Sequence, residues 1–97
     1  MSESEKKAFA DKIRNEISEW RARLEHLRVQ ASLGKMEARD RAQEIAQEIE
    51  ARIHETERKL KEFEESQAEN WKELSERLER IWHQVKDTAS GAMSNLR

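Results

Sequence analysis

The three histidines are the side chains best suited to metal binding or proton transfer, because an imidazole is both a common ligand and a base near neutral pH. A carboxylate-bridged di-iron bundle places a glutamate three residues before a ligating histidine, so that both side chains project inward from one helix. The positions three residues before the histidines hold Arg23, Ala51 and Arg80. The di-iron motif is therefore absent.

Two glutamate–histidine pairs are spaced by four residues, Glu50 with His54 and Glu79 with His83. In a helix each pair would share one face. Two ligands from one face make a weak metal site unless another chain completes it. We therefore interpret both pairs as surface contacts and expect no metal or other cofactor.

Other catalytic patterns are also missing from the sequence. There is no cysteine, which excludes a thiolate nucleophile, a disulfide and a cysteine-based metal site. The serines lie in cap-like or exposed contexts, and no histidine has the setting of a catalytic triad. A thin helical protein also lacks the concave pocket that catalysis usually requires. The sequence therefore predicts a protein that is not an enzyme.

The tryptophans are the most informative large side chains. Trp71 and Trp82 are eleven residues apart, which is three helical turns, so they are predicted to lie on one stripe of a helix. Trp20 holds the corresponding position in the first part of the chain. Each ring buries a large apolar area while keeping an N–H group that needs a partner. We expect these rings to fill a shallow core between helices.

A second interpretation of the same segment stays open. Residues 67–96 would form an amphipathic helix that lies on lipid or on the apolar surface of a client protein. The polar face of this segment mixes acidic with basic residues, which argues against lipid. The small side chains near its end would let the helix end bend away, which argues for it.

The composition indicates long helices that position these residues. The chain has 97 residues, enough for one domain; 41% are charged, none is proline and two are glycine. Apolar residues recur in steps of three and four, which is the helical period. The predicted fold is all-α, with long amphipathic helices in a coiled-coil helical hairpin or thin bundle. The expected core or interface seam comprises Ile13, Ile17, Trp20, Leu24, Leu27, Ile45, Ile49, Leu60, Phe63, Trp71, Leu74, Leu78, Ile81, Trp82 and Val85.

Two places could interrupt the helix within this single domain. Gly34 favours a turn near residues 33–36. Ser66 and Glu69 have capping-box spacing, which favours a turn near residues 64–68, where several glutamates crowd without a nearby base. Residues 90–97 are expected to form a flexible tail. The alternatives are antiparallel segments or one rod of up to about 145 Å, and we favour the folded-back form.

The remaining expectations concern partners and location. A single copy would bury its seam poorly, so we expect a homo-oligomer; a protein client and a membrane surface are further candidates. The net charge of −2 and the acidic residues within the basic span 21–41 do not favour nucleic acid. The sequence has no apolar run that could cross a membrane and no signal-peptide segment, so we expect a cytoplasmic protein.

A family resemblance rests on five features in order: Trp20, Glu65–Ser66, Trp71, Glu73–Leu74 and Trp82. In these features the chain resembles a family of small bacterial coiled-coil proteins, some of them described as stress-response proteins. The resemblance spans nearly the whole chain, although Gly34 departs from the family's glycine-free middle. It implies a structural or protective cytoplasmic protein that acts through self-association or client binding. It supplies no catalytic or binding residues.

Overall fold

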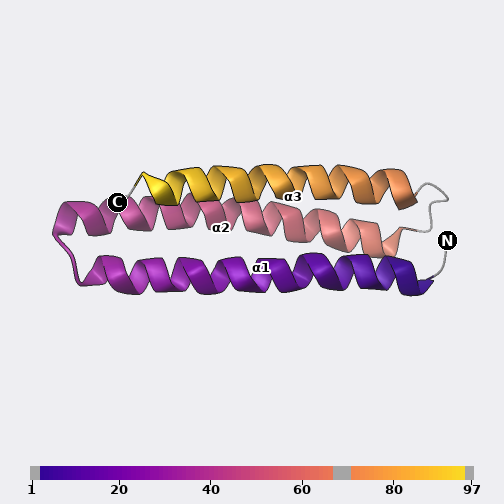
Figure 1. The fold of residues 1–97 in the computed structure, drawn as a ribbon, viewed down its shortest axis with the longest axis horizontal. Coiled ribbons are helices and arrows are strands. Elements are labelled where there is room, and N and C mark those ends of the chain that lie inside the picture. The colour runs from indigo at the N-terminus through magenta and orange to yellow at the C-terminus, as the bar shows by residue number, and fades with distance from the viewer. Residues whose placement is uncertain (1–2, 67–70, 96–97) are drawn as a thin grey trace.

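The computed structural model describes residues 3–66 and 71–95 of the 97-residue chain. Three helices make up the fold: α1 (Glu3–Ser32), α2 (Met36–Glu65) and α3 (Trp71–Ser94). They run up, down and up along one axis, so that α1 and α3 point the same way (Figure 1). The described residues contain no strand. The predicted all-α hairpin or thin bundle is confirmed.

The molecule is an elongated bundle of 52 × 17 × 17 Å. A helix of 30 residues is about 45 Å long, so α1 and α2 each span most of the long axis. This length excludes the single extended rod. With 24 residues, α3 is shorter by six residues, or about 9 Å. It leaves one end of the α1–α2 hairpin without a third helix (Figure 1).

The first turn lies at residues 33–35, within the predicted range. The last turn of α1 is closed by two backbone hydrogen bonds, from Leu33 N–H to the Gln30 carbonyl (3.2 Å) and from Gly34 N–H to the Ala31 carbonyl (3.0 Å). Gly34 does not have a positive φ. A Cβ at this position would meet only the Ala31 carbonyl oxygen, at an ordinary 3.5 Å. The chain therefore turns here without needing the conformational freedom of glycine.

The second interruption follows Glu65, the last residue of α2. Ser66 has an extended backbone, and its N–H donates to the Phe63 carbonyl. The predicted capping box requires Glu69, which lies outside the described residues, as do residues 67–68 of the predicted turn. At the other end of α3, residues 90–94 of the expected flexible tail are helical.

The core runs along the bundle axis and contains most of the predicted seam. Ten of its fifteen residues are buried: Ile13, Ile17, Trp20, Leu24, Ile49, Leu60, Phe63, Leu78, Trp82 and Val85. The other five are half-buried: Leu27, Ile45, Trp71, Leu74 and Ile81. At one end of the core the Phe9 and Phe63 rings pack edge to face, with centroids 5.2 Å apart.

Two of the three tryptophans are enclosed by a single chain. Trp82 is 1% exposed and Trp20 is 6% exposed, while Trp71, the first residue of α3, is half-buried. The premise that one copy would cover its seam poorly is therefore wrong for Trp20 and Trp82. Self-association through these rings would require the bundle to open.

Candidate interaction surface

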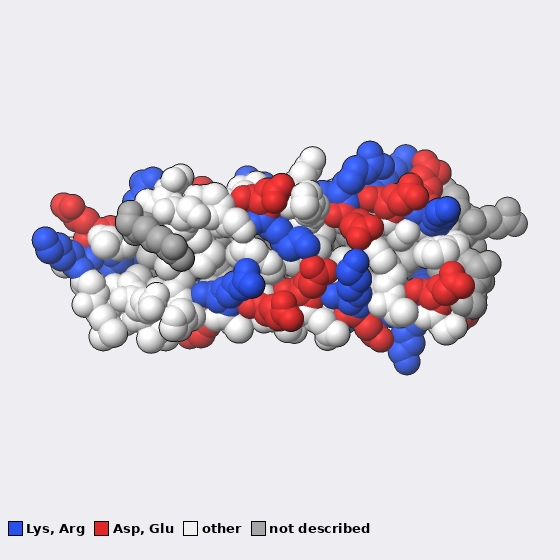
Figure 2. Space-filling view, viewed as in Figure 1, with Lys and Arg blue, Asp and Glu red and all other residues white. Residues whose placement is uncertain are grey.

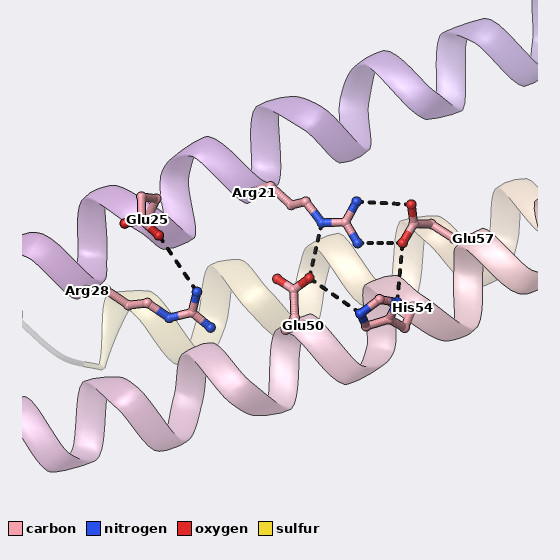
Figure 3. Close-up of polar contacts among 6 residues, drawn as sticks. All are labelled: Arg21, Glu25, Arg28, Glu50, His54 and Glu57. Carbon is pink, nitrogen blue, oxygen red and sulfur yellow. Dashed lines mark hydrogen bonds and ion pairs between the residues drawn. The ribbon is translucent and has the colours of Figure 1, made fainter.

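The polar side chains between α1 and α2 converge on Arg21. Its Nε donates to Glu50 Oε1 at 3.1 Å, and its two terminal nitrogens grip both oxygens of Glu57, one of them at 3.0 Å (Figure 3). A bidentate arginine–carboxylate pair is among the strongest charged contacts in proteins. His54 lies beside both carboxylates, 3.8 Å from Glu50 and 3.5 Å from Glu57. This arrangement clamps α1 to α2.

The charges of this cluster stabilise one another. The hydrogen bond from Arg21 lowers the pKa of Glu57 below its ordinary 4.5, against a smaller opposing effect of burial. The hydrogen bond to Glu57 raises the pKa of Arg21 above its usual value. Both groups are therefore charged at neutral pH. The Arg21–Glu57 pair is therefore a contact between two charged groups that joins α1 to α2.

Of the two glutamate–histidine pairs in the sequence, one is in contact in the structure and the other is not. Glu50 and His54 do lie together, within the Arg21 cluster. His83 instead contacts Asp87 at 3.4 Å, and Glu79 contacts Lys12 of α1 at 3.3 Å. Across residues 3–66 and 71–95, no group of three or more histidine, aspartate or glutamate side chains is placed to hold a metal ion.

One of the glutamates crowded at the end of α2 pairs with a basic residue that lies far away in the sequence. Arg14 of α1 pairs with Glu64, and Lys6 of α1 donates to the Ser66 carbonyl. On the α3 side, Lys86 pairs with Glu16 at 2.8 Å. The expectation of an unpaired acidic cluster is therefore wrong for Glu64, because antiparallel packing brings the start of α1 to the end of α2.

Three of the six basic residues in the predicted span 21–41 make contacts within the chain. Arg21 is held by two carboxylates, the Arg23 guanidinium lies over the Trp20 ring at 4.8 Å, and Arg28 pairs with Glu25 at 3.8 Å. These three side chains do not form an open phosphate-binding row. The other three basic residues of the span, Lys35, Arg39 and Arg41, lie beyond them, around the first turn.

Open grooves between the helices are lined in part by half-buried apolar residues. A groove of about 330 Å³ between α2 and α3 is lined by Phe63, Leu74 and Ile81 among others. A groove of about 590 Å³ at the end of α3 is lined by Met93, Leu27 and Trp20 among others. Met93 and Ser94, the last residues of α3, line this groove together with Leu27 and Gln30 of α1. The end of α3 therefore lies short of the first turn.

The surface beyond this stop is the end of the hairpin, residues 27–42, which we name the hairpin tip. It carries Val29, Leu33 and Met36, which are 52%, 85% and 68% exposed. No other large apolar side chain among the described residues is exposed. Figure 2 shows uncharged surface over the C-terminal part of α1 at this end, with charged side chains over the beginning of α2. An apolar cluster of this kind is typical of a contact surface.

The hairpin tip also differs in charge from the rest of the molecule. It holds four basic and two acidic residues, a net charge of +2. Since the whole chain has a net charge of −2, the remainder carries −4. Within the described chain, Lys35, Arg39 and Arg41 form no ion pair, unlike the basic residues between the helices. The tip is thus a basic, apolar end on an acidic bundle.

Sequence reasoning missed the hairpin tip and two polar core residues. Thr56 and Ser75 are buried, and each donates its hydroxyl to a carbonyl of its own helix. Both residues continue the three- and four-residue steps between apolar neighbours, and this spacing could have predicted that they are buried. For the tip, the signal was an apolar i, i+4 pair, Val29 and Leu33, lying off the seam.

Comparisons with protein-family models, with curated proteins and with solved structures found no match. The resemblance to small bacterial coiled-coil proteins therefore stays a prediction. The function has to be argued from the surface itself.

Proposed function

We propose that the protein is a non-enzymatic structural protein that contacts a partner surface through the hairpin tip while the three-helix bundle stays closed. The observation that carries this proposal is the gathering of Val29, Leu33 and Met36, all exposed, at one end. The charged clusters elsewhere already join helix to helix. The work of the protein is then recognition, with the bundle as a rigid support.

The protective role implied by the family resemblance, in a bacterial cytoplasm, fits this mode of action. A partner of any class, whether a client protein, a second copy or a membrane surface, would meet the tip and leave the tryptophan core undisturbed. Lipid binding by a detached α3 is less favoured, because Leu78, Trp82 and Val85 are buried against the other helices. Detaching α3 would expose these residues and the partners they cover.

Photo-crosslinking tests whether the tip is the contact surface, whatever the partner. A benzophenone-bearing residue is placed at position 33 in one variant and at position 84 in another. Leu33 lies at the tip and Gln84 is exposed on the side of α3. In a bacterial extract with its membranes, we expect position 33 to give several times more adducts than position 84, with protein or lipid. Equal labelling from the two positions would refute the tip as the contact surface.

A further inference from the structure

We propose, resting on the function above, that the partner surface is an anionic lipid bilayer, which the hairpin tip enters end-on. The described helices contain none that is long and apolar enough to cross a membrane. The contact would therefore be peripheral: apolar side chains of the tip enter the interfacial layer, and basic side chains meet the lipid headgroups. The tip has an apolar set of residues for the first of these contacts and a basic set for the second.

The apolar half consists of three side chains around the turn. Leu33 is the first of the three residues that connect α1 to α2, Met36 is the first residue of α2, and Val29 lies one helical turn before Leu33. At 85% and 68% exposure, Leu33 and Met36 contribute little to the core. They lie at the α1–α2 connection, at one end of a bundle 52 Å long, and α3 does not extend to this end (Figure 1).

The basic half surrounds this cluster. Lys35 lies in the turn itself, and Arg39 and Arg41 follow in the first turns of α2. Their charges are not neutralised by ion pairs within the described chain, so they remain able to bind lipid phosphates. Glu37 and Asp40 oppose these three, and the formal +2 of the tip includes Arg28, which pairs with Glu25. Basic side chains beside an anionic leaflet each strengthen binding severalfold.

A second copy of this chain is a poorer partner for the tip. In a symmetric tip-to-tip dimer, two surfaces of charge +2 would repel each other. In a head-to-tail contact, the tip would meet the acidic remainder of the bundle, which complements its charge but exposes no described large apolar residue. An anionic bilayer instead combines opposite charge with an apolar interior, and both complement the tip.

Vesicle partitioning tests the proposal with the full chain. The probes are vesicles of phosphatidylcholine and phosphatidylglycerol in equal parts, and vesicles of phosphatidylcholine alone. We expect the protein to bind the anionic vesicles and to bind the neutral ones at least tenfold more weakly. The variant Leu33→Ser/Met36→Ser should bind the anionic vesicles at least about tenfold more weakly than the wild type. Its thermal midpoint should be unchanged.

A charge variant and its matched control make the test specific to the tip. Lys35→Gln/Arg39→Gln/Arg41→Gln should lose about a hundredfold in partitioning, since each charge is worth about fivefold. Lys7→Gln/Arg52→Gln/Arg80→Gln changes the net charge equally at exposed positions outside the tip and should lose less than about twofold.

The outcomes separate this inference from the proposed function. No binding to anionic vesicles, equal binding to neutral ones, or equal losses in the two charge variants would overturn lipid docking. If crosslinks from position 33 then fall on a protein, the tip remains the contact surface and only its partner is wrong. If crosslinks from position 33 do not exceed those from position 84, the proposed function fails as well.

Discussion

Replacing Trp82 by alanine is expected to lower the free energy of unfolding by about 3–5 kcal/mol, the cost of deleting a large buried aromatic side chain. The Trp82 ring is 1% exposed and belongs to the core that joins the three helices. Its loss would leave a cavity on the axis of the bundle. Chemical denaturation followed by circular dichroism measures the effect.

Trp71 provides the matched control, because it is the same residue type on the same helix but half-buried at its first position. Trp71→Ala should cost about 1–2 kcal/mol, less than the buried site. The double variant should therefore lose several kcal/mol, most of it from Trp82. An unchanged unfolding midpoint in Trp82→Ala would contradict the placement of this ring in the core. The Trp82 N–H is buried and has no acceptor among the described residues. Trp82 therefore stabilises the bundle mainly through the packing of its ring.

The second expected loss follows from the clamp at Arg21. Arg21→Met should lower the free energy of unfolding by about 1 kcal/mol at neutral pH; the estimate is kept small because both Arg21 and Glu57 are about one-third exposed. Methionine keeps the apolar stem and removes the guanidinium, so Glu50 and Glu57 both lose the positive charge that they share. Urea denaturation of the two proteins across a pH series measures the difference.

The pH dependence of that loss has a definite sign. Because Arg21 lowers the pKa of Glu57 from its ordinary 4.5, the stabilisation is complete above pH 4.5. It should decline as the pH falls below 4.5 and through the lowered pKa of folded Glu57. Arg58→Met is the control, since Arg58 pairs with Glu55 on the exposed surface of α2 and should cost only about 0.3–0.5 kcal/mol. A difference between wild type and Arg21→Met that persists undiminished to low pH would contradict the clamp.

The sequence was sufficient to predict the helices because their apolar period is a local property. Three- and four-residue steps, together with the absence of proline, indicate helix wherever they occur. Gly34 and the weak seam around it were the signal for the turn at residues 33–35, although the turn does not require a glycine. Thr56 and Ser75 were missed because their polarity masks an otherwise regular step. Each satisfies its hydroxyl within its own helix, which lets a polar residue occupy the core.

The interaction surface could not be predicted in the same way, because it depends on how far one helix reaches along two others. Leu33 and Met36 are exposed and lie beyond the end of α3, whose last turn lines a groove with Leu27 and Gln30. A sequence does not show this register. The same holds for Arg14 with Glu64, residues 50 positions apart that antiparallel packing brings together.

The most direct measurement of the central claim is the tryptophan emission of the unmodified protein, alone and with anionic vesicles that bind it. Trp20 and Trp82 are buried in the bundle, and none of the tryptophans lies in the hairpin tip. We therefore predict blue-shifted emission in buffer that vesicle binding leaves unchanged. Red emission in buffer that moves to the blue on vesicles would contradict the account, because it would mean that the bundle opens and that the rings themselves meet the lipid.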